Sequence, residues 1–150
     1  MTPRYLPHAL ATLVVALLTT SCELETSGNG KLDGYWHMER VDTIATGGVR
    51  DVSDQLLFWS FQNKLLMLND RSGANPTCIV HFDAKTEPNV ILTSSPYISD
   101  RANGDVLIED YTILWPYGIT DLNESINIDH LSGSKMILRD ELVIITFRRL

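Results

Sequence analysis

The sequence predicts an all-β domain, an antiparallel up-and-down barrel of about eight strands. Beyond residue 30, apolar residues gather in short runs rich in β-branched and aromatic types and show no helical period. Gly, Asn, Asp, Ser and Pro cluster between these runs and predict turns. The connections are too short for crossover helices, so neighbouring runs are expected to pair antiparallel. A sandwich of two sheets is the alternative arrangement of the same strands.

The expected strands follow one another at short intervals. They cover residues 35–43, 55–62, 65–68, 77–82, 89–93, 125–131, 135–139 and 142–149. Residues 45–54 and 94–105 have the composition of loops. Residues 106–114 are expected to be extended until Trp115-Pro116-Tyr117-Gly118 interrupts them.

Alternation along a strand predicts which side chains point into the barrel, because successive residues face opposite sides. In the second and the last strand, apolar residues share one face, and we assign these two faces to the interior. They are Leu57, Trp59 and Phe61 in the second strand, and Val143, Ile145 and Phe147 in the last.

The chain begins with the three parts of a secretion signal. Residues 1–8 are polar and basic, residues 9–18 are predominantly apolar, and small residues then lead to Cys22. Because a helix needs about 20 residues to span a bilayer, the apolar run is too short to do so. A buried core helix is the alternative for this run. The expected divisions of the chain are 1–21 as signal, 22–31 as flexible tether and 32–150 as folded domain.

The residues before Cys22 resemble the lipobox of bacterial lipoproteins. Thr20 and Ser21 fit its small-residue pattern, whereas Thr19 stands where an aliphatic residue is usual. The resemblance implies that Cys22 is acylated and becomes the first residue after cleavage. Several acyl chains anchor stably, since each buried CH₂ contributes about 0.8 kcal/mol. We therefore expect a membrane partner through this lipid, in the cell envelope at the outer membrane; ordinary signal cleavage near the same point is the alternative.

The composition limits the partners of the domain. The chain has a formal net charge of −7, and loss of a signal that contains Arg4 and no acid makes it −8. Nucleic acid is excluded as a partner because phosphate binding needs clustered Lys and Arg. With two cysteines in the chain, acylation of Cys22 leaves Cys78 without a partner. Cys78 lies in an apolar run and is expected to be buried; a reactive thiol is the alternative.

Two short segments resemble the signature of lipocalins. Gly34-Tyr35-Trp36 gives Gly-x-Trp at the start of the first strand, and the last strand closes on Arg149. In lipocalins a late Arg packs across the Trp ring, an arrangement that a guanidinium favours. The resemblance implies a barrel-closing set of Gly34, Trp36 and Arg149, with Arg148 as the alternative cation.

Residues 32–150 as a whole resemble the lipocalin-like lipoproteins of Bacteroidetes. The resemblance is carried by the segments LDGYW, QLLFWSFQNKLLML, PYGI, SKMILRDE and ITFRRL. It implies a lipocalin-like eight-stranded barrel outside the cytoplasm, with room for a small molecule. Asp42-Thr43-Ile44 is similar to the O-glycan acceptor of exported proteins in these bacteria, which makes Thr43 a candidate glycosylation site.

Large and soft side chains supply the candidate lining of a ligand pocket. They are Met38, Trp59, Phe61, Met67, Tyr111 and Trp115. Small eight-stranded barrels either fill with side chains or hold one small ligand, and the same residues suit a filled core. Two functions stay open. The chain is either a binder of a small hydrophobic ligand, or a non-enzymatic module that docks a protein or glycan through barrel-end loops, where Trp115 and Tyr117 are expected to be exposed.

The sequence shows no pattern of catalytic or metal-binding residues. His37, His81 and His130 are scattered without ligand spacing, and neither a nucleophile elbow nor a phosphate loop occurs. His37 and Glu39 share one face of the first strand, which we expect to be a solvated outer face. We therefore expect no enzymatic activity, no cofactor and no metal.

Overall fold

The computed structural model describes residues 27–85 and 89–150. The elements in chain order are η1 (Gly30–Leu32), β1 (Gly34–Thr43), β2 (Val49–Asp51), β3 (Leu57–Gln62), β4 (Leu65–Asp70), β5 (Cys78–Lys85), β6 (Val90–Ile98), β7 (Val106–Leu107), η2 (Tyr111–Tyr117), β8 (Ser125–Leu131), β9 (Lys135–Arg139) and β10 (Val143–Arg149), where η marks a 3-10 helix. The expected signal and Cys22 lie outside the described residues. Within the described ranges, no helix is both long and apolar enough to cross a membrane.

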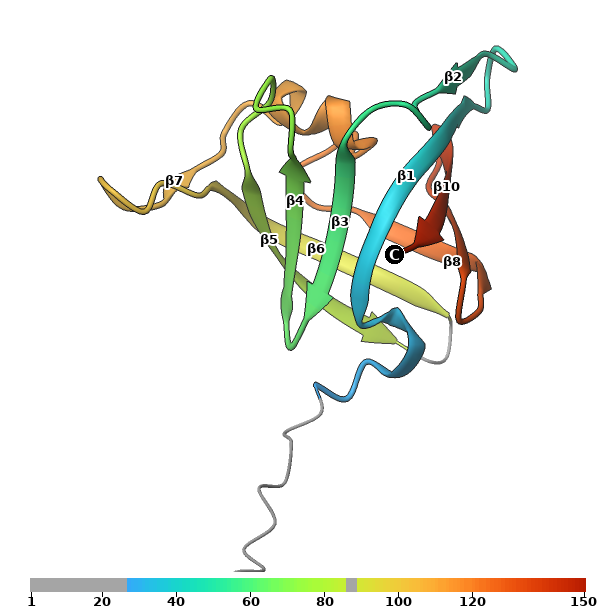
Figure 1. The fold of residues 1–150 in the computed structure, drawn as a ribbon, viewed down its shortest axis with the longest axis horizontal. Coiled ribbons are helices and arrows are strands. Elements are labelled where there is room, and N and C mark those ends of the chain that lie inside the picture. Colours follow the sequence, from blue (N-terminus) through green and yellow to red (C-terminus); the bar gives the residue numbers. More distant parts are fainter. Residues whose placement is uncertain (1–26, 86–88) are drawn as a thin grey trace, which may run out of the picture.

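Eight strands form a closed antiparallel ring in the order β1-β3-β4-β5-β6-β8-β9-β10 (Figure 1). The ring closes because β10 pairs with β1, with Trp36 opposite Arg149 and Thr43 opposite Val143. The short strands β2 and β7 add to β1 and β6. The closure confirms the predicted barrel over the sandwich, whose sheets would leave strand edges unpaired.

Two segments predicted as loops contribute strands. The 45–54 segment contains β2, and β6 runs on through Ser94 to Ile98. β6 holds one extra residue at this point, where Ser95 adopts a positive φ of 48°. Such a bulge accommodates Pro96, which cannot donate a ladder hydrogen bond. Turn-forming residue types therefore sit inside a strand at a bulge.

The segment predicted to be extended at 106–114 is mostly helical. β7 covers two residues, and η2 then begins at Tyr111. Asp110 starts this helix, since its side chain accepts a hydrogen bond from the backbone N–H of Thr112 at 2.9 Å. Gly118, with a φ of 81°, ends it in the left-handed conformation.

The predicted inward faces of β3 and β10 are confirmed. Their buried members, each at most 3% exposed, are Leu57, Trp59, Phe61, Ile145 and Phe147. Val143 is only partly buried, because it lies where β10 begins at one end of the barrel.

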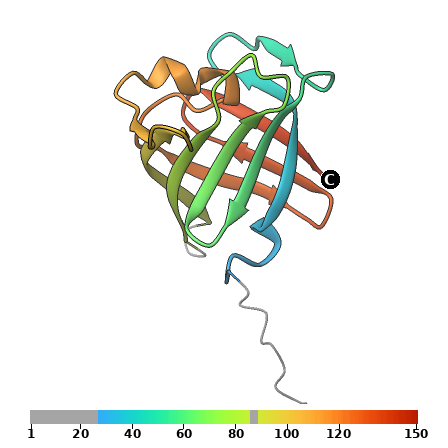
Figure 2. The same cartoon turned by 60° about the vertical axis from the view of Figure 1, so that its left-hand side comes forward.

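The two ends of the barrel differ. β2 and η2 lie at one end, which we call the mouth, and η1 lies at the opposite, closed end (Figures 1 and 2). Ser27, the first described residue, is also at the closed end, because its hydroxyl donates to the side chain of Asp33 between η1 and β1. The described chain therefore enters the barrel at the end remote from the mouth.

The closed end is built around the fully buried ring of Trp36. The Trp36 Nε1–H donates to the carbonyl of Leu32 at 2.9 Å. The Arg149 guanidinium lies 5.2 Å from the Trp36 ring centroid and donates to the carbonyl of Asp33 at 2.6 Å. Gly34 makes room for it, since a Cβ there would lie 2.7 Å from Arg149 Nη2. The sequence-predicted set thus meets at one point.

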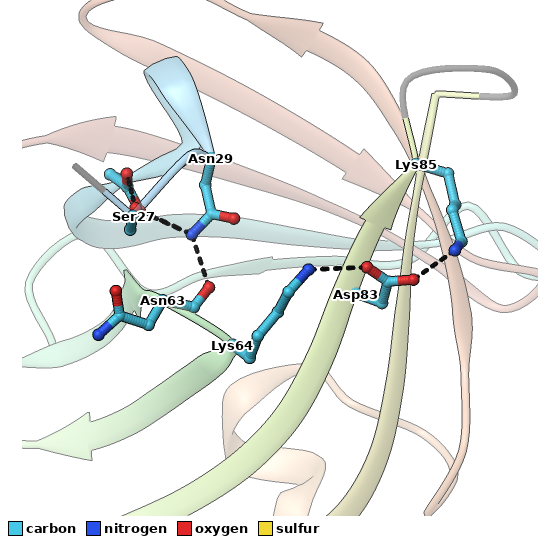
Figure 3. Close-up of polar contacts among 7 residues, drawn as sticks. Ser27, Asn29, Asn63, Lys64, Asp83 and Lys85 are labelled. Carbon is cyan, nitrogen blue, oxygen red and sulfur yellow. Dashed lines mark hydrogen bonds and ion pairs between the residues drawn. The ribbon is translucent and has the colours of Figure 1, made fainter. Parts of the chain in front are cut away.

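Polar contacts attach the N-terminal segment to the β3–β4 turn (Figure 3). The Asn29 side chain donates to the carbonyl of Asn63 at 2.8 Å. Asn63 tolerates the positive φ of 55° that this turn requires. Beside it, Lys64 lies 2.9 Å from Asp83, which also pairs with Lys85. These ion pairs are exposed, so water and salt screen them and they contribute little to stability.

We expect Gly34→Ala to lower the free energy of unfolding by about 1–3 kcal/mol. The added Cβ meets the Arg149 guanidinium, and the φ of 124° at this position is strained for any side chain. Urea denaturation measures the change. Gly47→Ala is the control, because Gly47 also has a positive φ but nothing lies within 4 Å of its Cβ position. Equal losses in the two variants would contradict a special role for the Gly34–Arg149 contact.

Candidate functional site

An apolar groove of about 620 Å³ opens at the barrel mouth. Its walls come from the end of β1, from β2, from η2 and from the start of β10. The residues that line it are Val41, Thr43, Ala45, Arg50, Tyr111, Trp115, Gly118, Thr120, Leu142 and Val143. Most of these side chains are apolar, and Arg50 is the only charged one among them.

A β-bulge in β1 determines which side chains enter the groove. The register with β10 shifts between Met38 and Arg40, so Glu39 is an extra residue. Without the shift, alternation from Met38 would turn Arg40 inward; with it, Val41 points inward and is 6% exposed. Val41 pairs directly with Arg50 of β2. Opposite residues share a face of the sheet, so Arg50 also faces the groove.

The helix η2 forms the second wall. The rings of Tyr111 and Trp115 meet edge to face with centroids 5.8 Å apart. They stay 43% and 52% exposed beside the groove. The structure corrects the expectation for Tyr117, which is fully buried. Its hydroxyl donates to the carbonyl of Pro76 at 2.7 Å, which ties η2 to the loop before β5.

At the floor of the groove, the backbone of Gly118 lies close to side chains of the core. A Cβ on Gly118 would lie 2.6 Å from Ile145 Cδ1 and 3.7 Å from Met38 Cε. Gly118 also has a φ of 81°. Only glycine lets the chain pass over the core at this distance in this conformation.

Beneath the floor, aromatic side chains fill the barrel. The Trp59 ring lies 5.1 Å from that of Phe147 and 6.0 Å from that of Phe61. All three are at most 2% exposed. The Trp59 Nε1–H donates to the carbonyl of Tyr117 at 3.1 Å, so its polar atom is satisfied inside the core. The interior is therefore a packed core, and the groove lies above it.

Only some of the residues predicted to line a pocket lie at the groove. Tyr111 and Trp115 line the groove. Met38, Trp59 and Phe61 belong to the packed core. They do not line the mouth groove and follow the alternative of a filled core, which a barrel of eight strands is narrow enough to allow.

Met67, which was also predicted to line a pocket, lies outside the groove. It is 36% exposed on the outer face of β4, while its neighbours Leu66 and Leu68 are fully buried. Sequence reasoning missed most of the mouth, including Arg50, because short strands and bulges there carry no clear alternation. Thr43, the candidate glycosylation site, is exposed at the end of β1 and lines the groove.

Arg50 links the two walls across the mouth. Its Nη2 donates to the carbonyl of Pro116 in η2 at 3.2 Å. Burial lowers the pKa of the guanidinium from its ordinary value, because apolar surroundings penalise the charged form. None of the five ion pairs found between described residues involves Arg50.

A second cleft adjoins the groove at Thr120 and contains Glu124 and Asp140. Glu124 Oε1 accepts hydrogen bonds from the Thr120 hydroxyl at 2.6 Å and from the Asp121 N–H at 2.8 Å. Burial raises the pKa of this carboxyl. Asp140 accepts from the backbone N–H of Leu142 at 2.6 Å. Both carboxyl groups therefore stabilise loops by accepting hydrogen bonds from nearby residues.

The three histidines that the structure describes, His37, His81 and His130, do not form a reactive cluster. His37 is 6% exposed, not solvated as expected, because the segment before β3 covers it. Its Nε2 lies 2.7 Å from the carbonyl of Gln55. Glu39 turns away and pairs with Arg148 at 2.9 Å. Among the residues that the structure describes, no group of three or more His, Cys, Asp or Glu side chains is placed to hold a metal ion.

Comparisons with known proteins agree with this geometry. A family model described as a lipocalin-like domain matches residues 16–150. The structure resembles that of a lipocalin-like protein from Bacteroides uniformis, with 19% identity, a TM-score of 0.59, and coverage of 81% of this chain and 100% of the other. It also resembles an uncharacterised protein from Bacteroides eggerthii, with 18% identity, a TM-score of 0.55, and coverage of 79% and 99%. These likenesses show a shared fold. No curated protein matches the chain.

We expect Glu124→Gln to flatten the dependence of stability on pH. Because the pKa of Glu124 is higher in the folded protein, its contribution to stability is full below its ordinary value of 4.5 and is lost as pH rises through the raised value. The variant should therefore gain stability relative to the parent between pH 4 and pH 7. Urea denaturation at several pH values measures this difference, with Glu141→Gln in the exposed neighbouring turn as control. A constant difference would contradict the assignment.

We expect Cys78 to resist alkylation in the folded protein. Its side chain is fully buried, and burial raises the pKa of the thiol to about 11. The thiolate is the reactive form, so iodoacetamide at pH 8 should modify it roughly a hundredfold more slowly than in urea. Mass spectrometry of the peptide that contains Cys78 follows the reaction. Equal rates in both states would restore the reactive-thiol alternative.

Proposed function

Because the chain belongs to the family of lipocalin-like domains, we propose that it binds a small hydrophobic molecule in the mouth groove and catalyses no reaction. The groove carries the proposal, since its volume of about 620 Å³ and mainly apolar lining suit a small molecule. Ligand sites typically occupy about 300–1,000 Å³. The exposed rings of Tyr111 and Trp115 would lose contact with water when a ligand covers them, which favours binding.

The proposed ligand lies across the mouth and not deep in the barrel. Trp59, Phe61 and Phe147 occupy the interior, where each is at most 2% exposed. Displacing any of them would leave a cavity or force neighbouring strands apart, at a cost of about 1–3 kcal/mol or more. The open groove needs no such rearrangement.

We further propose that residues 1–21 direct export and that Cys22 carries a lipid anchor at the outer membrane. Five residues lead from Cys22 to Ser27 and span at most about 17 Å when extended. Ser27 lies at the closed end, where it contacts Asp33. An anchor at Cys22 would hold this end toward the bilayer, and the groove would face the aqueous compartment outside the cytoplasm.

Docking of a protein or glycan is the second candidate function. Cross-strand neighbours on the outer face of β4 to β7 form an apolar row of Met67, Ile79, Tyr97 and Leu107. Met67 and Leu107 are 36% and 50% exposed. Such a row outside the barrel contributes nothing to ligand capture, so it favours contact with a partner. Ligand binding in the groove discriminates between the two candidates.

We expect the neutral fluorophore N-phenyl-1-naphthylamine to bind saturably to the protein, with one molecule per chain. Trp115→Ala should weaken this binding by at least about fivefold, because the half-exposed indole supplies apolar contact worth roughly 1 kcal/mol or more. Fluorescence titration measures both affinities.

Met67→Ala is the matched control, because it removes an exposed apolar side chain from the outer face of the barrel. Its affinity for the fluorophore should equal that of the parent protein. No saturable binding by the parent, or an equal loss in both variants, would reject the groove as a ligand site and favour the docking module.

A further inference from the structure

We propose that the ligand of the mouth groove is an anionic amphiphile, with its apolar body along the groove and its negative head group bound by Arg50. The inference rests on the proposed function, since it names the chemical class that the same groove selects. It is carried by the position of one cation on an otherwise uncharged apolar surface.

The fold directs Arg50 into the groove. Arg50 lies opposite the inward-facing Val41, so its side chain leaves β2 on the inner face. The hydrogen bond to the carbonyl of Pro116 then holds the guanidinium between β2 and η2. A guanidinium has five N–H donors, and this bond uses one of them. Donors therefore remain for a ligand that lies between the two walls.

The charge of Arg50 lacks a partner among the described residues. The five ion pairs between described residues engage other cations with Asp or Glu: Arg40, Lys64, Lys85, Arg139 and Arg148. The lining of the groove contains no acidic side chain. Arg50 stays exposed at the mouth, so its remaining donors are accessible, and partial desolvation against the groove lowers the pKa of its guanidinium. A bound oxyanion would supply the charge partner that the lining lacks.

The chemistry of the guanidinium fits a carboxylate or a phosphate. Both present two oxygens that a guanidinium binds in a bidentate, charge-assisted manner. The nearby rings of Tyr111 and Trp115 and the side chains of Leu142 and Val143 offer an apolar surface for the rest of the molecule. A fatty carboxylate and an alkyl phosphate share this chemistry, and direct comparison separates them.

The test compares dodecanoate and dodecyl phosphate with the neutral dodecan-1-ol by calorimetric titration of the protein. Both anions should bind at least about tenfold more tightly than the alcohol, because a hydrogen bond to a charged group contributes more than a neutral one. Arg50→Gln should abolish this preference and leave affinity for the alcohol within about twofold. Arg50→Lys keeps the positive charge but loses the planar set of donors that allows bidentate binding. Its preference for the anions should therefore be intermediate.

Lys135→Gln is the matched control, because it removes one exposed positive charge from the start of β9, outside the groove. It should leave all three affinities unchanged. The better anion identifies the head group as carboxylate or phosphate.

Several results would overturn the inference. If the parent protein binds the alcohol as tightly as the anions, the groove binds ligands without charge selection, and the proposed function stands alone. If Arg50→Gln weakens all three compounds equally, Arg50 only clamps η2. If the parent binds none of them, the proposed function fails as well. Should Arg50→Gln not fold, the parent comparison and the Arg50→Lys variant still decide.

Discussion

The pairing of β10 with β1 is the constraint on which the rest of the structure depends. Closing eight strands fixes the barrel at a diameter that side chains can fill. Closure also brings the two ends of the described chain together, so that Arg149 lies over the ring of Trp36. The contact works because Gly34 has no side chain to displace the guanidinium. The same closure removes every long open edge from the ring, since β1 and β10 satisfy each other's backbone groups.

A barrel of this width cannot hold both a large aromatic core and a deep ligand cavity. Here Trp59, Phe61 and Phe147 occupy the interior. The groove accordingly lies at the mouth, where the strands end. Three local irregularities create it: the bulge at Glu39, the short strand β2, and the helix η2. The candidate site is thus made by departures from the regular barrel, while the regular barrel supplies the rigid support.

This division explains what could be predicted from the sequence. The ring and its inward faces follow from alternation, because residues such as Trp59 and Phe61 recur at the period of a strand. Alternation gives no answer where both faces of a strand are apolar, as in the run of leucines around Met67. The sequence therefore did not determine which way the Met67 side chain points. A bulge has no characteristic amino-acid composition, so the sequence did not indicate the register shift at Glu39. The residues 106–114 are rich in β-branched types, yet the cap at Asp110 favours a helix there.

The position of Arg50 illustrates why a site cannot be inferred from net charge. The whole chain carries a formal charge of −7, which by itself disfavours anions. At physiological ionic strength, however, exposed charges are screened over about 8 Å. A ligand in the groove lies closest to the groups that line it, and these include one cation and no acid, although the adjoining cleft with Glu124 and Asp140 shares Thr120 and Leu142 with the groove. Next to apolar walls, which exclude water, the attraction between a bound anion and the adjacent guanidinium is stronger than in bulk water. On the proposed function, the net charge describes the surface as a whole, and the local charge at Arg50 would select the ligand.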